Sequence, residues 1–425
     1  MSRKIFALVD CNNFYAACER VFNPELICKP IGILSNNDGI IVALSNELKQ
    51  LGIHRGTPGF KIKDQIKKYD IKIFSSNYTL YGDMSARVMK TLSQFTPDIE
   101  IYSIDEAFLS LTGFEYLNLT EYGKKIKETV RKWTGLPVSI GIGPTKTLAK
   151  VANRFAKKHK YTDGVFNISG YPELEKILEW IDVEHIWGVG CQYAKMLRRN
   201  GIENALQLSR TPDKWVQKKM TIVGLRTAKE LRGISCIDLE IDIDPKKEIV
   251  SSKSFGTPVT ELQDLQEATA SYCVRAVEKL REQNLVASQI MVFLTTNRFK
   301  NEPQYANYAN ARLSVPSAYT PDFLKAAHKI LESIYRPGYN YKKAGVMICD
   351  IIHQSKAPFD LFEPTYLDDH RKVIMDCIDE INGKMGSNKL TYAAVGIEQP
   401  WQMRREILTP GYTTNWHHIP VVYAR

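Results

Sequence analysis

The chain has 425 residues, of which 44% are hydrophobic and 24% charged, and its formal net charge is +10. This length exceeds what one hydrophobic core usually fills, so we expect roughly two to four domains. No apolar stretch approaches the roughly 20 residues of a membrane-spanning helix, and Asp10 ends the first apolar run, so we expect neither a signal peptide nor a membrane segment. The positive charge favours a polyanionic partner, nucleic acid first. Eight scattered cysteines without a CxxC pair favour reduced thiols in the cytoplasm and argue against a zinc site.

Residues 1–168 combine strand and helix patterns. The continuous apolar run Ile5–Val9 predicts a central strand buried on both faces. Ile31–Ser35 and Ile40–Leu44 predict two strands joined by a hairpin, because Asn-Asn-Asp-Gly lies between them. Helices are expected from Asn13, at 81–95, at 121–133 and from Thr145. Antiparallel strands with helices on one side indicate an α+β domain of ferredoxin-like type.

The pattern changes after this domain. Residues 169–240 predict several short helices, and the polar, proline-containing residues 241–247 predict a linker. Residues 248–353 return to an α+β pattern, with helices at 262–283 and 321–335 between strands. Residues 354–425 carry one amphipathic helix, at about 366–381, in an otherwise loosely structured tail.

Three carboxylates lie at strand ends in the first domain. Asp10 ends the first strand, while Asp105 and Glu106 lie at the turn of a hairpin of strands at 99–102 and 107–111. A carboxylate at the end of a buried strand is costly unless it is paired, and the sequence shows no obvious cationic partner. We therefore predict Mg²⁺ held by carboxylate oxygens, provided that the turn breaks the alternation that points neighbouring strand residues to opposite faces. The alternative is three acids that cap or hydrogen-bond turns.

A basic stripe follows on the helix from Thr145. Lys146, Lys150, Arg154 and Lys157 recur every three or four residues, and like charges at this spacing repel one another. An anionic ligand, either a triphosphate or a DNA backbone, would offset that repulsion. The alternative is a solvated cationic face.

A second candidate for phosphate binding lies among the short helices. Ile186–Gly190 precedes a helix at 191–199 that carries Lys195, which is the form of a helix-hairpin-helix. Gly188 and Gly190 would let backbone N–H groups approach a phosphate closely, without reading base sequence. A weaker copy is expected at 221–226. The alternative is a plain packing corner between helices.

Two aromatic residues, Phe14 and Tyr15, follow Asp10 into the first helix. Adjacent residues of a helix do not point to the same side, so we expect one ring to pack in the core and the other to line the cleft. There it can stack on a sugar or exclude a hydroxyl group.

Taken together, these motifs resemble the Y-family of translesion DNA polymerases, and within it the catalytic subunits of bacterial DNA polymerase V, the UmuC type. The similarity spans nearly the whole chain and is carried by segments at 10–15, 34–39, 74–78, 102–108, 146–153, 187–190, 252–256, 343–347, 401–405 and 412–414. The resemblance implies a right hand with an added domain. Its parts are a palm at 1–14 and 81–168, fingers at 15–80, a thumb at 169–240, a linker at 241–247, a little finger at 248–353 and a C-terminal extension at 354–425.

The resemblance also implies roles for single residues. Asp10, Asp105, Glu106 and the Cys11 carbonyl would bind two Mg²⁺ ions, and Tyr15 would be the steric gate that collides with a ribose 2′-hydroxyl. Asn13, Phe14, Lys49 and Lys150 would hold the triphosphate, although Asn46 and Lys49 stand where many members carry Tyr and Arg. DNA contacts would come from Lys146, Arg154, Gly188, Gly190 and Lys195.

The implied activity is template-directed, low-fidelity DNA synthesis during the SOS response to DNA damage, with primer-template DNA and dNTPs as substrates. Phe359, Leu361 and Phe362 would bind the sliding clamp, with Pro358 where the clamp motif usually has Gln. A cleaved UmuD-type accessory dimer and a recombinase filament would contact the extension. Two alternatives stay open: a nucleotidyl cyclase on a similar palm, and a non-catalytic DNA-binding repair scaffold.

Overall fold

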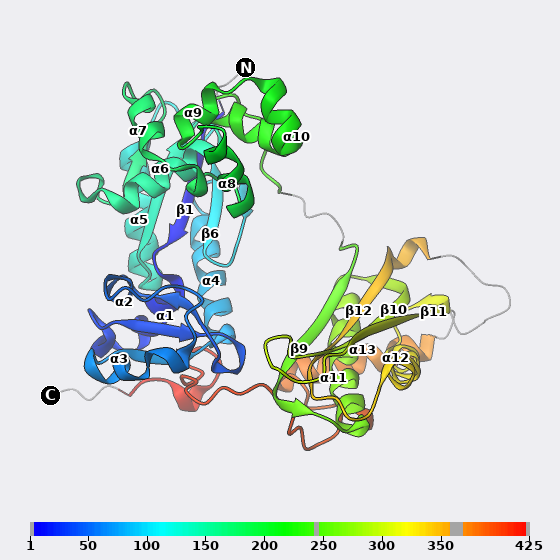
Figure 1. The fold of residues 1–425 in the computed structure, drawn as a ribbon. Coiled ribbons are helices and arrows are strands. Elements are labelled where there is room, and N and C mark those ends of the chain that lie inside the picture. The colour runs from blue at the N-terminus through cyan, green and yellow to red at the C-terminus, as the bar shows by residue number, and fades with distance from the viewer. Residues whose placement is uncertain (1–3, 242–245, 358–368, 422–425) are drawn as a thin grey trace. The chain divides into compact units, whose positions relative to one another are not determined.

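A computed structural model of the chain describes residues 4–241, 246–357 and 369–421 (Figure 1). These residues form two compact units. The first unit comprises Met1–Ser35, Gly39–Ile243 and Ile407–Arg425, and the second comprises Asn36–Asp38 and Asp244–Glu406. Within the described ranges no helix is long and apolar enough to cross a membrane.

A five-stranded sheet in the order β5-β6-β1-β7-β8 forms the centre of the first unit (Figure 1). Its strands are β1 (Phe6–Cys11), β5 (Ile99–Ile101), β6 (Glu106–Ser110), β7 (Val138–Gly143) and β8 (Val165–Asn167). The apolar run therefore forms the central strand, as predicted, and β1 pairs antiparallel with both β6 and β7. The predicted acidic hairpin is confirmed as the antiparallel pair β5–β6.

Helices cover both faces of this sheet, so the expectation of helices on one side was wrong. Helices α4 (Tyr78–Leu92) and α5 (Leu119–Thr134) pack on one face and α6 (Lys146–Lys158) on the other. The reason lies in β7, where a Cβ atom at Gly141 would come within 2.0 Å of the backbone nitrogen of Asn153 in α6. Without a side chain at Gly141, the α6 backbone can lie directly on the strand.

A smaller sheet in the order β3-β2-β4 also belongs to the first unit. Strands β2 (Ile31–Leu34) and β3 (Ile41–Leu44) form the predicted antiparallel hairpin, and β4 (Lys72–Ser75) runs parallel to β2 at the edge. Short helices surround this sheet: α1 (Phe14–Phe22), α2 (Asn46–Gln50) and α3 (Lys63–Lys68).

The helical part of the first unit packs around an apolar core that it shares with α6 and with Phe166 of β8. It contains α7 (Leu174–Trp180), α8 (Cys191–Arg199), α9 (Ala205–Arg210) and α10 (Asp213–Leu231). Gly188 adopts φ 85°, which glycine tolerates readily, and Gly190 is the N-cap residue of α8. Helix α10 is interrupted at Thr221, where φ is 63°, which is the place of the predicted weaker copy of the hairpin.

The second unit is a four-stranded antiparallel sheet in the order β11-β10-β12-β9 with helices packed on it (Figure 1). The strands are β9 (Ile249–Val259), β10 (Leu285–Thr296), β11 (Ala306–Ser317) and β12 (Tyr341–His353), and the helices are α11 (Leu262–Arg281), α12 (Thr320–Ile334) and α13 (Asp369–Met385). This arrangement confirms the α+β pattern predicted for this part of the chain.

The expected C-terminal extension does not form one body. Buried Val395 and Trp401 belong to the core of the second unit, because both pack with its strands and helices. The segment from Ile407 onwards belongs to the first unit, where Tyr412 packs against the apolar core. A tail that the sequence suggests is loose is thus divided between two hydrophobic cores.

Candidate active site

A cavity of about 810 Å³ lies in the first unit, at the ends of β1 and α6. Its volume is within the range of pockets that hold drug-sized or nucleotide-sized ligands. The predicted site residues that line it are Asp10, Cys11, Asn13, Phe14, Tyr15, Lys49 and Asp105. The cavity therefore brings together most of the nucleotide and metal residues that the sequence singled out.

Asp10 and Glu106 are direct register partners on β1 and β6. Asp105 precedes β6, and its carbonyl accepts a hydrogen bond from the Cys11 backbone N–H at 2.9 Å. Ser103 organises this turn, because its hydroxyl donates to Asp105 Oδ1 at 2.7 Å and accepts from the Glu106 N–H at 3.0 Å. Asp10 and Asp105 both line the cavity, whereas Glu106 does not line it and pairs with Lys150 instead.

The sequence suggested no cationic partner for these acids, and that premise was wrong. Lys157 Nζ lies 2.5 Å from Asp10 Oδ1, and Lys150 Nζ lies 2.8 Å from Glu106 Oε2. Burial raises the pKa of Asp10 to about 7, against the lowering effect of Lys157. Burial also opposes ionisation of Glu106, but the ion pair with Lys150 outweighs it and holds the pKa of Glu106 below its usual value.

The donor chemistry of this cluster fits a divalent cation. Its carboxylate oxygens are the ligands that Mg²⁺ prefers. Two of the carboxylates, Asp10 and Glu106, form ion pairs with lysines, which shows that the cluster attracts cations. In the described ranges no group of three or more acidic, His or Cys side chains is drawn together closely enough to hold a metal ion as it stands. Lysine ammonium groups lie on one oxygen of Asp10 and on one oxygen of Glu106.

Tyr15 lies at the wall of the cavity on α1, while neighbouring Phe14 is 4% exposed and belongs to the core. The expected division is only partly seen, because both residues line the cavity and Tyr15 also packs against the same core. The Tyr15 ring stacks on that of Tyr81, with centroids 4.2 Å apart and planes 14° apart. This stacking fixes the plane of the Tyr15 ring.

Several cationic side chains surround the same cavity. Lys49 donates to Asn13 Oδ1 at 2.7 Å, and burial together with nearby Lys157 and Lys158 lowers the pKa of Lys49. Lys157, which belongs to the predicted basic stripe, lines the cavity together with Lys158 and Arg55, which were not predicted as nucleotide residues. Lys150, which was predicted, is not among the lining residues, because its ammonium group lies on Glu106 and over the ring of Tyr102. A basic run at 157–158 at the end of α6 was the signal available in the sequence.

Lys146 is not placed to contact DNA, and that prediction needs correction. Its side chain is 2% exposed, and its ammonium group lies 2.6 Å from Glu100 Oε2. It also donates to the Asp238 carbonyl at 3.2 Å and lies over the ring of Phe108. These partners hold the charge of Lys146 inside the protein.

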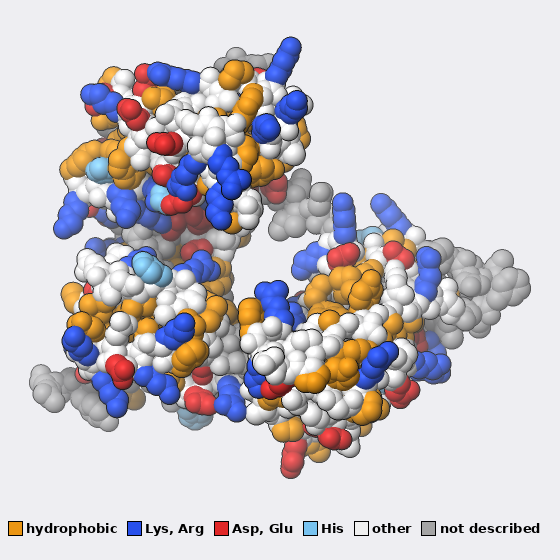
Figure 2. All heavy atoms as spheres, in the orientation of Figure 1, with side chains coloured by type: hydrophobic (Ala, Val, Ile, Leu, Met, Phe, Trp, Pro, Cys, Tyr) orange, Lys and Arg blue, Asp and Glu red, His pale blue; other side chains and the backbone are white. Residues whose placement is uncertain are grey.

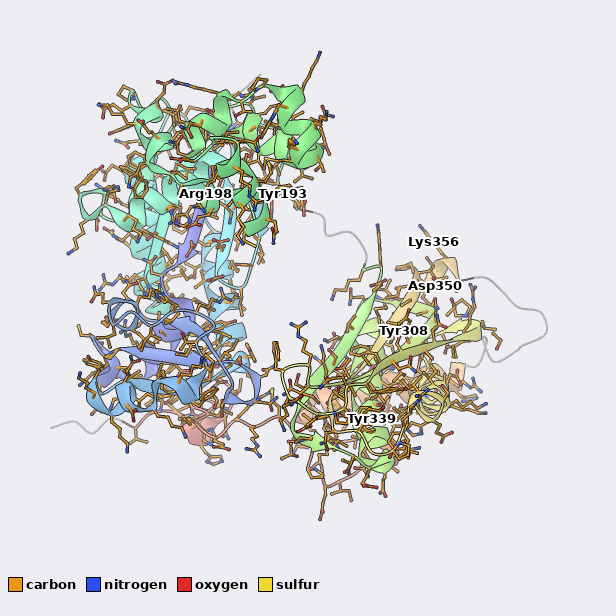
Figure 3. All side chains as sticks on the ribbon, viewed as in Figure 1. Tyr193, Arg198, Tyr308, Tyr339, Asp350 and Lys356 are labelled. Atoms are coloured by element: carbon orange, nitrogen blue, oxygen red, sulfur yellow. The ribbon has the colours of Figure 1, made fainter. Side chains whose placement is uncertain are left out.

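The helical part presents an exposed basic surface. Figure 2 shows Lys and Arg side chains gathered around α8 and α10. Lys195, Gly188 and Gly190 are exposed there, as a phosphate contact requires, and Arg154 is half-buried. Arg198, labelled in Figure 3, is held by Asp182 at 2.7 Å and Glu184 at 3.0 Å. The expected clamp residues Phe359, Leu361 and Phe362 lie outside the described residues.

Two solved structures resemble this fold. A Y-family DNA polymerase chimera of Dbh and Dpo4 matches with a TM-score of 0.64 at 21% identity, covering 82% of this chain and 99% of the other. DinB from Sulfolobus solfataricus matches with a TM-score of 0.52 at 21% identity, with the same coverage. The fold is that of Y-family DNA polymerases.

Sequence comparisons narrow this class. The impB/mucB/samB family matches residues 9–154, the C-terminal domain of that family matches 246–361, and a domain of unknown function (DUF4113) matches 372–422. Protein UmuC of Salmonella typhimurium is 45% identical over 97% of this chain and 98% of its own length, and Protein SamB of the same organism is 40% identical over 98% and 99%. DNA polymerase IV of Brucella melitensis is 26% identical over 91% and 84%. The chain belongs to the impB/mucB/samB family of Y-family polymerases, and it is a DNA-directed DNA polymerase of the translesion class.

Proposed function

We propose that the cavity around Asp10 is the polymerase active site, where a dNTP is joined to a primer 3′-hydroxyl with release of pyrophosphate. The observation that carries this proposal is the meeting of Asp10 and Asp105 with a set of cations, Lys49, Arg55, Lys157 and Lys158, around one cavity of nucleotide size. Acidic groups suit the metal end of a bound nucleotide, and the cations suit its phosphates.

Asp10, Asp105, Glu106 and the Cys11 carbonyl would hold two Mg²⁺ ions. Y-family polymerases generally use divalent metals, which stabilise the attacking and leaving oxygens of an in-line displacement. Lys157 and Lys150 keep Asp10 and Glu106 paired in the free enzyme. Lys157 lies at the cavity wall, so its ammonium group can pass from Asp10 to a phosphate oxygen when nucleotide enters.

The nucleotide would be oriented by the start of α1. Asn13, the N-cap residue of α1, has φ 50°, and its side chain makes no capping hydrogen bond, so the first backbone N–H groups of α1 would be available for phosphate oxygens. Lys49, Lys157, Lys158 and Arg55 would hold the triphosphate. Tyr15 would exclude the ribose 2′-hydroxyl, because its stacked ring lies at the same cavity wall.

We assign the palm to 1–14 and 81–168, the fingers to 15–80, the thumb to 169–240 and the little finger to 248–353. The three sheets each lie within one of these parts, which supports the assignment, while the apolar core of the thumb continues into α6 of the palm. Exposed Lys195, with Gly188 and Gly190 at the start of α8, would hold the DNA backbone.

Primer extension tests the active-site assignment. With Mg²⁺, dNTPs and a primed template, Asp105→Asn should abolish extension and leave DNA binding near that of the parent chain. Asp98→Asn is the matched control, because Asp98 is an exposed aspartate that precedes β5 of the same hairpin. Extension by the Asp105→Asn variant would refute the assignment. A cyclase would consume nucleotide without a template, and a scaffold would bind DNA without consuming any.

We also propose that this polymerase acts on cytoplasmic DNA with a sliding clamp, a cleaved UmuD-type dimer and a recombinase filament. The similarity to Protein UmuC, 45% identical over nearly full length, supports the UmuD-type partner. Replacing Leu361 and Phe362 together by Ala should remove clamp-stimulated synthesis and preserve synthesis without the clamp. A loss of both would show that these residues serve the fold instead.

A further inference from the structure

The C-terminal docking segment, Ile407–Tyr412, lies against the first unit beside the small sheet. The Ser75 backbone N–H donates to the Ile407 carbonyl at 2.9 Å, and the Ile407 N–H donates to Ser75 Oγ at 3.1 Å. Ser75 is the last residue of β4, the edge strand, so the segment satisfies polar groups that an edge leaves open. The ring of Tyr412 stacks on Phe22 of α1, with centroids 4.8 Å apart and planes 6° apart.

Asn77 joins this segment to the start of α4. Its Oδ1 accepts from the Leu80 N–H at 3.2 Å, which caps the helix, while its amide donates to Thr409 Oγ1 at 3.0 Å. The hydroxyl of Thr409 is therefore held in place by a residue that also fixes the first turn of α4.

The Thr409 hydroxyl reaches a buried carboxylate. Glu19 of α1 is 1% exposed, and its Oε1 accepts from Tyr81 Oη at 2.7 Å and from Thr409 Oγ1 at 3.3 Å. Burial raises the pKa of Glu19 to about 7. A buried carboxyl group needs such donors, because an unsatisfied one costs free energy. The C-terminal segment supplies one of the two.

Tyr81 links this carboxyl group to the cavity. Its ring is fully buried and stacks on Tyr15 at 4.2 Å, and the ring of Tyr78 meets Tyr15 edge-on at 6.2 Å. The hydroxyl of Tyr81 is anchored by Glu19, so the position of Glu19 fixes the surface on which Tyr15 rests.

We propose that Thr409, Glu19 and Tyr81 are positioning residues for Tyr15, so that the C-terminal segment sets how strictly the polymerase rejects ribonucleotides. This inference rests on the proposed role of Tyr15 as the steric gate. It gives a role to part of residues 372–422, the region that matches a domain of unknown function.

The test compares incorporation of dNTP and the matching rNTP by the full chain on a primed template, as the ratio of the two kcat/KM values. Thr409→Val removes the hydroxyl at nearly constant volume, together with its hydrogen bonds to Glu19 and Asn77, and should lower this ratio at least about fivefold, the effect expected for one hydrogen bond. Thr409→Ser should restore the ratio, because it keeps the hydroxyl. Thr413→Val is the matched control, since the Thr413 hydroxyl has no hydrogen-bond partner in the part of the chain that the structure describes.

Tyr81→Phe provides a second route to the same result. It retains the ring that stacks on Tyr15 and removes only the hydroxyl that Glu19 holds. It should lower the ratio to the same extent as Thr409→Val, and combining the two should give less than the product of the single effects. Thermal melting of each variant identifies any chain that fails to fold. If either Thr409→Val or Tyr81→Phe fails to fold, the selectivity of the other variant tests the positioning role.

Tyr15→Ala distinguishes the proposed steric-gate role of Tyr15 from the positioning role of Thr409, Glu19 and Tyr81. If Tyr15→Ala relaxes sugar selectivity while Thr409→Val and Tyr81→Phe leave it unchanged, the positioning role is refuted and the gate stands. If Tyr15→Ala leaves selectivity unchanged, the gate assignment fails, and this inference fails with it. Equal relaxation by Thr409→Val and Thr413→Val would also overturn the inference, since it would indicate general loosening of the tail.

Discussion

Lys157, in the last turn of α6, lies on Asp10, near the end of β1, with 2.5 Å between Nζ and Oδ1. Lys150, about two helical turns earlier, reaches Glu106, the register partner of Asp10. One helix thus supplies the countercharges of two neighbouring strand-end carboxylates. This pairing offsets only part of the cost of burying the carboxylates: it holds the pKa of Glu106 below its usual value, while burial still raises the pKa of Asp10 to about 7.

We predict different effects for the lysines of α6. Lys157→Ala should lower kcat/KM for dNTP about 10- to 100-fold, mainly through KM, because it removes a charged donor from the phosphate end of the cavity. Lys160→Ala is the control, since this exposed lysine follows α6 and does not line the cavity. Steady-state single-nucleotide incorporation gives both values. An unchanged KM in the Lys157→Ala variant would contradict the triphosphate role.

Gly141→Ala should prevent normal packing of α6. The added Cβ would lie 2.0 Å from Asn153 N and 2.3 Å from the Ala149 carbonyl, and backbone atoms cannot move aside cheaply. We expect a loss of several kcal/mol in the free energy of unfolding, at the upper end of single substitutions, about 4 kcal/mol or more. Gly82→Ala in α4 is the matched control, because nothing lies within 4 Å of its added Cβ. It should be neutral or stabilising by up to about 1 kcal/mol. Urea unfolding of both variants tests the comparison.

We expect substitution of Lys146 to affect stability and substitution of Lys195 to affect DNA binding. Lys146→Ala leaves Glu100 buried without its partner, so it should cost roughly 3–5 kcal/mol of unfolding free energy. Lys195→Ala removes an exposed charge and should leave stability unchanged while weakening DNA binding and reducing its salt dependence. Urea unfolding and DNA titration at several salt concentrations measure the two effects. A stable Lys146→Ala variant with reduced DNA affinity would support the surface role that the sequence suggested.

Glu19 should make stability depend on pH. Its pKa is about 7 in the folded chain and near 4.5 when unfolded, so the folded chain holds a proton that the unfolded chain releases between these values. Stability from this group is therefore lost as the pH rises from about 4.5 to 7. Gln has no proton to lose, so the unfolding free energy of the Glu19→Gln variant should not fall over this range. The variant-minus-parent difference in unfolding free energy should therefore be up to about 3 kcal/mol larger at pH 8 than at pH 4. Urea unfolding across this pH range measures the difference, and Glu25→Gln is the control because Glu25 is exposed. A difference that does not change with pH would contradict the prediction.

Much of the site was predictable because it depends on local pattern. The strand end at Asp10 and the hairpin at Asp105 and Glu106 follow from apolar runs and a turn, and strand pairing then brings them together. Likewise, Tyr15 follows Asp10 directly, so its place near the acids follows from the chain itself.

The partners of the basic stripe were not predictable in the same way. Its spacing led us to expect an anionic ligand, but three of its lysines pair with the protein's own carboxylates: Glu100 for Lys146, Glu106 for Lys150 and Asp10 for Lys157. These pairs are remote in sequence, and they depend on how closely α6 packs on β7. Only the tertiary placement of the helix decides whether a lysine faces solvent, ligand or another residue.

The chain leaves the first unit near residue 243 and returns to it at Ile407. A protease site engineered into residues 241–247 would therefore produce a nicked protein whose C-terminal fragment keeps its own anchor, the stacked Tyr412 and the hydrogen-bonded Ile407. The two fragments would be expected to co-purify after cleavage. We expect the same complex to form from separately expressed halves, because the last residues of the C-terminal half bind the N-terminal half.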